Sequence, residues 1–388
     1  MASEPDLQQI RADVTALAGM TRDSAGPGER ASAAWLARRL REAGAADVEV
    51  QPYTGAPTYA HHNALLLAAA LAAGRAPRLV RAAVCLAALA AWEVDASGRA
   101  RALRRLLPRG EGANVVARVP ARGTAHGTLV VVAHHDAART GLMWHPSLTQ
   151  AGARRHLQRH SVDPFAAPVG VGLAAAALGL RAGRVVLAAA LALQLDLFRG
   201  RTVPGASDNA TGVAVALDLA RKPLEHLDLV VVLPGGEEAG MEGFAAALSR
   251  LDLDPARTLV LGLDTLGAGT PIVLEAEGAL LRHRYRAGDL ALADEGARLA
   301  GEPAPERWRI GGWTDPLLAL RAGLPTISLL SMGPGYFPHY HHPTDVPEHV
   351  DWAAVGRCAR IARGIAAAHA RRVEDPLHPR VAGHVRRR

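Results

Sequence analysis

Short apolar runs alternate with helical segments along most of the chain. Four mostly apolar runs have the length of buried strands: residues 128–133, 229–233, 259–263 and 326–330. Segments with helical spacing lie between or beside them, at residues 212–221, 243–251 and 290–300. Strands interleaved with helices are typical of an α/β domain with a largely parallel sheet, in which the central strands are buried on both faces.

The N-terminal region predicts two helices between residues 7 and 44. The second helix places several apolar residues on one face, namely Ala33, Leu36, Leu40 and Ala43. Gly44 follows directly and is placed to end this helix. A short extended run at residues 48–52 comes next.

Two regions, residues 63–92 and 165–198, are almost entirely apolar. Each contains two apolar stretches of about 11 to 16 residues around a basic turn, which predicts a helical hairpin. A membrane-spanning helix needs about 20 apolar residues, so each stretch is too short to cross a bilayer. We expect the hairpins to pack on each other or on a second copy of the chain in a homo-oligomer, and shallow membrane contact is the less favoured alternative. We assign the two inserted hairpin regions to residues 61–112 and 146–200.

Size and composition agree with this division. The chain has 388 residues, of which 49% are hydrophobic and only 4% aromatic, and these values exclude a disordered or collagen-like protein. Much of the apolar content lies in the two inserted regions, and the remainder suits one α/β domain. We therefore expect a single catalytic domain over residues 1–388 that carries two apolar additions.

The basic character of the chain does not indicate nucleic-acid binding. The net charge is +7 and the sequence pI is about 10.2, but Lys222 is the only lysine and the arginines are scattered. This skew is typical of biased genomic composition, and no nucleic-acid motif accompanies it. The start of the chain lacks the pattern of a secretory signal, so we expect a cytoplasmic protein, with a membrane-associated one as the alternative.

Polar residues follow the predicted strands at the points where sites form in such sheets. These groups are His134-His135-Asp136, Gly235-Gly236-Glu237-Glu238, Asp264, the loop 205–212 with Asp208, and Tyr340-His341-His342-Pro343-Thr344-Asp345. Taken singly, each group has an ordinary explanation as a turn or a helix cap. Taken together, they supply imidazoles and carboxylates suited to a pair of divalent cations. Cys85 and Cys358 are the only cysteines, so a thiolate zinc module is excluded.

The order of these motifs resembles the co-catalytic dizinc aminopeptidases. The chain shows H-x-D, G-A-x-D-N-x-x-G, G-E-E-x-G, an Asp after an apolar strand, and Y-H-x-P-x-D, in that order. Related enzymes include the glutamate carboxypeptidases and the glutaminyl cyclases. The resemblance covers roughly residues 5–60, 113–145 and 201–368. It implies a three-layer zinc-exopeptidase-like domain with a mostly parallel central sheet.

The resemblance also implies a role for each motif residue and two Zn²⁺ per chain. Asp208 would bridge the two metals, His134 and Asp264 would complete one set of ligands, and Glu238 and His341 the other. Glu237 would be the general base, and Asp136 would hold the second ring nitrogen of His134. The family often has a cis peptide after the bridging Asp, which is Asp208-Asn209 here.

Two histidines and one further motif fall outside this implied ligand set. The register of the motifs leaves His135 and His342 as neighbours of the site or as ordinary loop residues. One departure concerns Thr314-Asp315-Pro316, where the family frequently has S-D-H; Asp315 can still support the site, but the imidazole is missing.

These motifs favour a zinc-dependent metallo-aminopeptidase that hydrolyses the N-terminal peptide bond of a peptide or aminoacyl substrate. The resemblance implies a metal-bridging hydroxide with Glu237 as its base. A glutaminyl cyclase-like acyltransferase is the first alternative, although that reaction needs one zinc and the ligand set here is full. A carboxypeptidase stays open, because the sequence does not show what recognises a free amine or carboxylate. A non-enzyme built around the hairpins is disfavoured by the complete ligand set and by Glu237.

Overall fold

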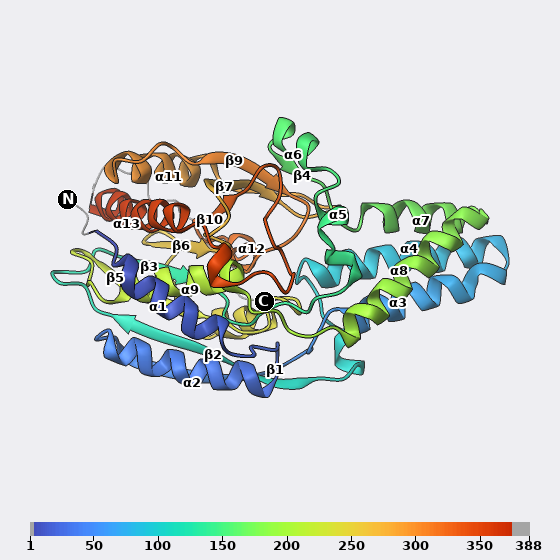
Figure 1. Ribbon diagram of the computed structural model, residues 1–388, viewed down its shortest axis with the longest axis horizontal. Helices are drawn as coiled ribbons and strands as arrows, with labels where there is room; N and C mark the ends of the chain where they lie inside the picture. The colour runs from blue at the N-terminus through green and yellow to red at the C-terminus, as the bar shows by residue number, and fades with distance from the viewer. Residues whose placement is uncertain (1–3, 375–388) are drawn as a thin grey trace.

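A ten-stranded sheet runs through the computed structural model, which describes residues 4–374 (Figure 1). In spatial order the strands are β1 (Ala46–Gly55), β2 (Gly110–Val119), β5 (Leu227–Leu233), β3 (Gly127–Val132), β6 (Thr258–Leu263), β10 (Thr326–Met332), β7 (Thr270–Glu277), β9 (Glu306–Ile310) and β4 (Ser161–Val162). The short strand β8 (His283–Arg284) pairs with β7 outside this order. All four strands predicted from apolar runs are present in the centre of the sheet.

The sheet is mixed, with its parallel part in the middle. β5, β3, β6 and β10 are parallel neighbours, and Val130 of β3 lies between Val230 of β5 and Val260 of β6. The pairs β1–β2, β2–β5 and β10–β7 are antiparallel. The expectation of a mostly parallel sheet therefore describes the centre. Antiparallel pairs extend the sheet through β2 to β1, and on the other side the antiparallel pair β10–β7 is followed by the parallel pairs β7–β9 and β9–β4. β2 was not predicted, because its Gly, Asn and Arg residues interrupt any apolar run.

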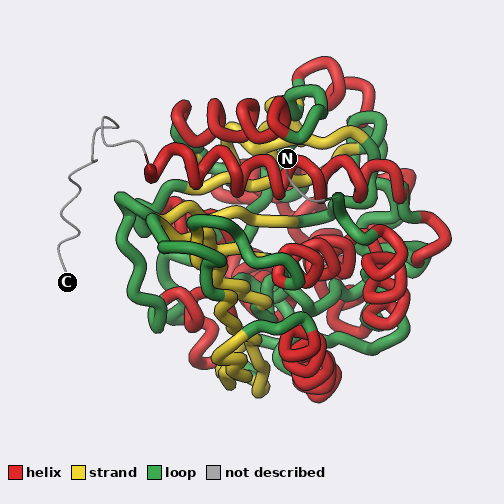
Figure 2. Tube along the Cα trace, turned by 90° about the vertical axis from the view of Figure 1, so that its left-hand side faces the viewer, coloured by secondary structure: helices red, strands yellow, loops and turns green. Residues whose placement is uncertain are grey.

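Helices cover both faces of the sheet, which gives three layers (Figures 1 and 2). Successive residues of β3 point to opposite faces: Leu129 and Val131 enter one apolar cluster, and Val130 and Val132 enter the other. The first face packs against α1 (Leu7–Ala18), α2 (Pro27–Glu42), α9 (Thr211–Ala220), α11 (Ala287–Leu299) and α13 (Trp352–Glu374). The second face packs against α10 (Glu242–Leu248) and α12 (Pro316–Arg321).

The N-terminal helices follow the predicted pattern. α2 buries Ala33, Leu36 and Leu40 on its apolar face. The helix ends two residues before Gly44, whose φ of +87° is a conformation that glycine adopts without a steric penalty.

Four helices form a bundle that projects from one end of the sheet (Figure 1). They are α3 (Ala60–Ala72), α4 (Arg78–Ala96), α7 (Ala167–Ala177) and α8 (Arg181–Arg199), and they are called the helical bundle below. Each helix contributes to a common apolar core that includes Leu67, Cys85, Leu173 and Leu187. The two hairpins therefore pack on each other. No helix within residues 4–374 is long and apolar enough to cross a membrane.

The region 146–200 contains more than a hairpin. Its first part forms the short helices α5 (Pro146–Thr149) and α6 (Ala153–Arg159), and then strand β4, which pairs with β9 at the edge of the sheet. The helical hairpin takes up only residues 167–199.

Candidate metal centre

The predicted site residues meet at the carboxyl ends of the central parallel strands. His134 follows β3, Glu237 and Glu238 follow β5, and Asp264 follows β6 directly. Because β5, β3 and β6 are parallel neighbours, their carboxyl ends share one edge of the sheet. The loop before α9 and the loop after β10 bring Asp208 and His341 to the same place.

Asp208 lies between the two histidines. Its Oδ1 is 3.3 Å from Nε2 of His134, and its Oδ2 is 3.2 Å from Nε2 of His341. Each oxygen of one carboxylate thus faces a different imidazole. This is the arrangement that a carboxylate shared between two cations requires.

Two further carboxylates complete two overlapping groups of donor atoms. Oδ1 of Asp264 is 3.7 Å from Nε2 of His134, and Oε2 of Glu238 is 3.1 Å from Nε2 of His341. The donor atoms of His134, Asp208 and Asp264 lie within 4.8 Å of one another, as do those of Asp208, Glu238 and His341. The structure therefore brings together all five residues assigned to metal binding.

The donor set fits zinc. It consists of imidazole nitrogens and carboxylate oxygens, which are common zinc ligands. Nε2 of His341 forms no hydrogen bond among the described residues, although two carboxylate oxygens lie within 3.2 Å of it. Oε1 of the neighbouring Glu238 is also buried without a hydrogen-bond partner among these residues. Unpartnered buried donor atoms around one centre are satisfied when a cation is bound.

The charges around the centre favour a cation. Burial by itself lowers the pKa of His341, but the carboxylates of Glu238 and Asp208 raise it to about 10. Burial likewise opposes protonation of His134, yet Glu237 and the adjacent carboxylates raise its pKa well above the ordinary value. Burial raises the pKa of Asp208, but its contacts with the two imidazoles lower it below the ordinary value. The carboxylates around the two ring nitrogens therefore favour positive charge at this place, which a divalent ion would supply when bound.

Asp345 holds the loop that carries Asp208. Its two carboxylate oxygens accept hydrogen bonds from the backbone N–H groups of Ser207, at 2.8 Å, and of Asp208, at 3.0 Å. Asn209 ties the same loop to the end of β6, because its side chain accepts from the N–H of Thr265 and donates to the carbonyl of Leu263. The Asp208-Asn209 peptide bond is cis, as the resemblance implies.

Asp136 positions residues of both groups. Its Oδ1 lies 3.4 Å from Nδ1 of His134, the ring nitrogen turned away from Asp208. The same carboxylate accepts hydrogen bonds from the backbone N–H groups of Glu237 and Glu238, at 3.1 and 3.2 Å, and from the hydroxyl of Ser24 at 2.6 Å. Asp136 therefore fixes a histidine and the two-glutamate turn relative to each other.

Glu237 lies beside the centre without belonging to either of these two groups. Its carboxylate comes within 4.8 Å of donor atoms of His134 and Glu238. Burial raises its pKa well above the ordinary value, the charge of His134 opposes this shift, and the carboxylates of Glu238 and Asp315 add to it. A carboxylate with a raised pKa next to a metal centre is suited to accepting and returning a proton.

The other two histidines of the paired motifs point elsewhere. Nδ1 of His135 contacts the hydroxyl of Ser32, and Nε2 contacts the carbonyl of Ala113, each at 2.9 Å. Burial lowers the pKa of His135 to about 4, so this ring is a neutral part of the core. His342 contacts Thr344 within its own loop. The register of the motifs selected the histidines that face the centre.

Two buried ionisable residues support the site and were not singled out in the sequence. Arg22 donates to the carbonyls of His135, Pro204 and Gly205 and so joins two of the site loops. Glu29 accepts from the backbone N–H of Gly236 at 3.0 Å, and burial followed by the charge of Asp136 raises its pKa to about 8. A signal for Glu29 was available, because it precedes Ala33 by four residues and falls on the apolar face of its helix.

Asp315 adjoins the site at the position where this chain departs from the family pattern. Both of its carboxylate oxygens are buried without a hydrogen-bond partner among the described residues. It lines a small pocket with His134 and Asp264. Burial raises its pKa well above the ordinary value, a shift that His134 opposes and Asp136 increases.

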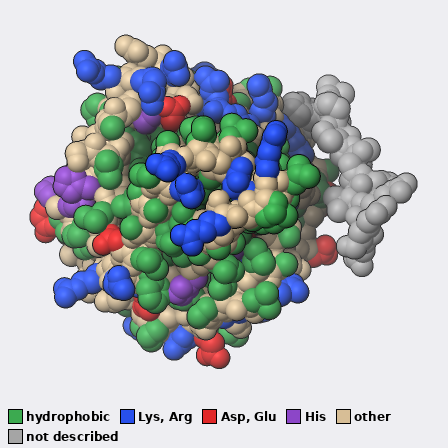
Figure 3. Space-filling model, turned by 90° about the vertical axis from the view of Figure 1, so that its right-hand side faces the viewer, with side chains coloured by type: hydrophobic (Ala, Val, Ile, Leu, Met, Phe, Trp, Pro, Cys, Tyr) green, Lys and Arg blue, Asp and Glu red, His purple; other side chains and the backbone are tan. Residues whose placement is uncertain are grey.

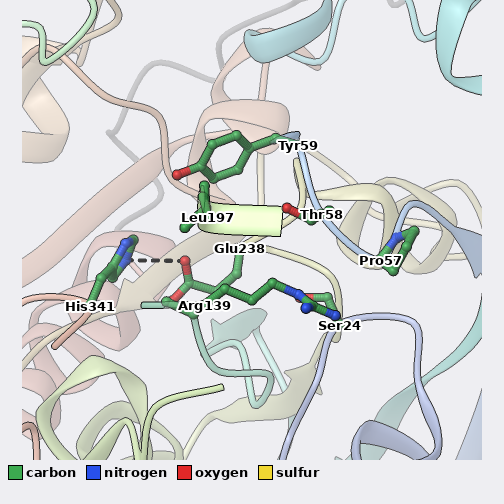
Figure 4. Close-up of a pocket in the computed structure, with 9 residues that line it drawn as sticks. Ser24, Pro57, Thr58, Tyr59, Arg139, Leu197, Glu238 and His341 are labelled. Atoms are coloured by element: carbon green, nitrogen blue, oxygen red, sulfur yellow. Dashed lines mark ion pairs between the residues drawn. The ribbon is translucent and has the colours of Figure 1, made fainter. Parts of the chain in front are cut away.

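A depression opens onto Glu238 and His341 (Figure 4). Figure 4 shows Tyr59 and Leu197 on one side of it and Arg139 beside Glu238. Tyr59 directly precedes α3 and Leu197 lies in the last turn of α8, so the base of the helical bundle forms part of this wall. The ring of Trp144 packs edge-on against His341, with 4.4 Å between ring centroids.

Comparisons with known proteins agree with this geometry. Residues 190–366 match the model of peptidase family M28. No curated protein sequence matches the chain. The resemblance to the zinc exopeptidases is therefore supported by a family match that contains Asp208, Glu237, Glu238, Asp264 and His341.

Solved structures of low sequence identity share the fold. An aminopeptidase from Aneurinibacillus sp. strain AM-1 aligns with 95% of this chain and 94% of its own, at 16% identity and a TM-score of 0.56. A zinc aminopeptidase from Bacillus subtilis aligns with 94% of this chain and 95% of its own, at 15% identity and a TM-score of 0.58. A glutaminyl cyclase from Bacteroides thetaiotaomicron aligns with 94% and 98%, at 15% identity and a TM-score of 0.56. The family match supports the resemblance to the zinc exopeptidases, and these structures show that the chain shares their fold.

Proposed function

We propose that this chain, which matches peptidase family M28 through residues 190–366, is a zinc-dependent aminopeptidase that binds two zinc ions. The observation that carries the proposal is the position of Asp208, whose two oxygens face His134 and His341 separately. The family match and the zinc aminopeptidases among the similar folds support the choice of metal. We further propose that residues 1–388 form one peptidase domain, to which the hairpins of regions 61–112 and 146–200 are additions.

Two sets of residues would hold the metals. His134 and Asp264 would bind one ion, Glu238 and His341 the other, and Asp208 both. Bound zinc supplies a Lewis acid for the scissile carbonyl and lowers the pKa of water. The backbone carbonyl of Asp136, 3.2 Å from Nδ1 of His134, and its carboxylate, 3.4 Å away, keep His134 in the orientation that presents Nε2 to the centre.

Glu237 would handle the proton of the reaction. Its side chain lies next to the donor atoms of His134 and Glu238, while its backbone is held by Asp136. It accepts a proton from the attacking water and delivers it to the leaving amine, so the residue is unchanged after one turnover. Burial raises the pKa of Glu237 above its ordinary value, which favours uptake of the proton.

The depression beside the centre bears on substrate choice. Tyr59 and Leu197 give it an apolar wall. Arg139 gives it a positive charge, and its guanidinium is held by the carbonyls of Phe198 and Gly200. That charge favours a second candidate, a carboxypeptidase that binds the terminal carboxylate of its substrate.

A substrate panel separates these activities. The zinc-loaded protein is assayed with an aminoacyl anilide, the same anilide with an acetylated amine, an N-blocked dipeptide with a free carboxylate, and a peptide that begins with glutamine. An aminopeptidase cleaves only substrates with a free amine. Cleavage of the N-blocked dipeptide alone would establish the carboxypeptidase, and cyclisation without hydrolysis would establish the glutaminyl cyclase-like alternative.

Metal analysis tests the number of ions. Zinc is added in excess, the protein is passed through a desalting column, and zinc is measured per chain. Two ions per chain are expected for the wild type. A value of one would contradict the dizinc proposal and would favour the cyclase-like reaction.

A further inference from the structure

The helical bundle is apolar on its outside as well as in its core. Large hydrophobic side chains are exposed on all four of its helices. They include Leu65 on α3, Leu79, Val80 and Leu86 on α4, Val171 on α7, and Val185 and Leu195 on α8. A helix that is apolar all round is normally surrounded by protein or by lipid, whereas a surface helix in water keeps a polar face.

The two most exposed hydrophobic side chains of the bundle lie at its tip, where the two hairpin turns are. At the turns, Leu79 is 81% exposed and Leu178 is 74% exposed. Near the base of the bundle the values fall to 44% for Leu195 and 37% for Val94. The most prominent hydrophobic side chains thus stand at the end farthest from the sheet.

The charges of the bundle are also separated along its length. Residues 61–92 and 164–195 contain no Asp or Glu. Arg75, Arg78 and Arg181 are exposed at the turns, and Arg184 lies beside them. The nearest acidic residues, such as Glu93 and Asp196, lie at the base. Figure 3 looks onto this end of the molecule and shows hydrophobic and basic side chains next to one another, with acidic ones away from the centre.

We propose that the tip of the helical bundle docks on an anionic phospholipid surface. Leu79, Val80, Leu178 and Leu180 would enter the boundary between headgroups and acyl chains. Arg75, Arg78 and Arg181 would lie among the lipid phosphates. The combination of apolar side chains with basic ones, and the absence of acidic residues between them, is complementary to such a surface.

A lipid surface accounts for the pattern better than a second copy of the chain. A second copy presenting the same tip would bring arginines against arginines, and like charges at a contact are repelled. It would also cover one side of the bundle, whereas exposed hydrophobic residues occur on every helix. An interfacial layer can surround the whole tip.

The proposed contact is shallow. No helix within the described residues can cross a bilayer, and arginines at the turns are costly to place in hydrocarbon. α8 runs from Arg181 at the tip to Leu197 at the depression, which at 1.5 Å per residue is about 24 Å. The candidate metal centre would therefore remain in water, held at this height above the lipid.

Vesicle co-sedimentation of the full chain tests the proposal without any peptidase assay. The protein is mixed with vesicles of phosphatidylcholine alone or of phosphatidylcholine with phosphatidylserine, at low and at high salt. We expect binding to the phosphatidylserine vesicles that weakens with salt, and little binding to the neutral ones. Failure of the proposed enzymatic function would leave this result unchanged.

Surface variants assign the binding to the tip. The double substitution Leu79→Glu and Leu178→Glu is expected to lower the partition coefficient at least tenfold. Arg78→Ala and Arg181→Ala are each expected to lower it about fivefold. Leu106→Glu is the matched control, since Leu106 is 80% exposed but lies outside the bundle, and it is expected to bind as the wild type does.

Several outcomes would overturn the proposal. These are no binding to the phosphatidylserine vesicles, equal binding to both vesicle types, or wild-type binding by the Leu79→Glu and Leu178→Glu variant. Light scattering that shows a dimer which the same double variant dissociates, without lipid binding, would assign the tip to a second copy instead. Circular dichroism is used to check that each variant is folded. The substituted side chains are exposed, so we expect the fold to be kept.

Discussion

The carboxylate of Asp345 accepts a hydrogen bond from the backbone N–H of Asp208, at 3.0 Å. Its other oxygen accepts from Ser207, so one buried side chain fixes the loop that presents the shared carboxylate. Burial raises the pKa of Asp345 to about 7, which its hydrogen bonds with the two backbone N–H groups oppose. Asp345 belongs to a sequence motif, but its role is visible only in its contact with Asp208, which lies 137 positions earlier in the chain.

Asp345→Asn is expected to weaken zinc binding by about 10- to 100-fold. The amide has one acceptor oxygen in place of two, so one of the two N–H groups loses its partner. Zinc affinity is measured by competition with a chromogenic chelator. Asp351→Asn is the matched control, because Asp351 also accepts two backbone N–H groups but does so at the start of α13. Equal zinc affinity of Asp345→Asn and wild type would contradict the positioning role.

Glu237→Gln is expected to lower kcat by about 10² to 10⁴ and to leave zinc content unchanged. The amide keeps the shape of the side chain but cannot take up a proton, and Glu237 is outside the proposed ligand set. Activity on an aminoacyl anilide and zinc per chain are measured on the same sample. Full activity would show that Glu237 is not the base, and loss of zinc would show that it is a ligand.

Asp95→Asn is expected to destabilise the protein by about 3 kcal/mol. Asp95 in α4 accepts from Nε and Nη2 of Arg104, at 2.8 and 2.6 Å, and both side chains are buried. Removing one partner of a buried ion pair leaves the other charge uncompensated, which costs about 3–5 kcal/mol. Glu242 lies 3.8 Å from Arg104 and partly compensates its charge, so the loss of stability is expected near the lower end of this range.

Urea unfolding measures this difference against a surface pair. Asp294→Asn removes the partner of Arg307, and both of those side chains are partly exposed, so its cost is expected below about 1 kcal/mol. Arg104 also donates to the carbonyl of Ala239, the residue after Glu238. Similar losses of unfolding free energy for the two substitutions would show that the buried pair of Asp95 and Arg104 stabilises the protein no more than a surface pair does.

The contribution of Glu277 to the stability of the metal-free protein is expected to fall as pH rises from about 4.5 to about 7. Burial raises the pKa of Glu277 from 4.5 to about 7, against hydrogen bonds from Tyr285 and Thr314. In this window the folded chain keeps a proton on Glu277 that the unfolded chain has lost. A rise in pH therefore favours the unfolded state, by up to about 3 kcal/mol for this group.

Glu277→Gln is expected to remove this contribution from the pH dependence, because the amide does not titrate. Unfolding by urea is followed in the presence of a chelator at several pH values. Glu275→Gln serves as the control, since Glu275 lies on the same strand and pairs with Arg309 at the surface. A pH dependence in Glu277→Gln as steep as in wild type would rule out Glu277 as its source.

The sequence by itself determined the central strands and the identity of the candidate ligands. Apolar runs of Val and Leu mark strands that are buried on both faces. The polar side chains that follow these runs can then be recognised as candidates for a site. The resemblance of H-x-D and H-x-P-x-D to the family motifs also separated His134 and His341 from the histidines beside them. These features are local, and local patterns survive in a single sequence.

Only the tertiary structure decided what depends on contacts between distant segments. Several features rest on partners far along the chain. They are the antiparallel pairs beside the parallel centre of the sheet, the strand Ser161–Val162 at its edge, and the roles of Arg22 and Glu29. The sequence showed that the hairpins are apolar, but a residue's exposure is set by packing. The structure shows that the hairpins fill their common core and still leave Leu79 and Leu178 in solvent. This exposure favours the membrane contact that the sequence alone left as the less favoured alternative.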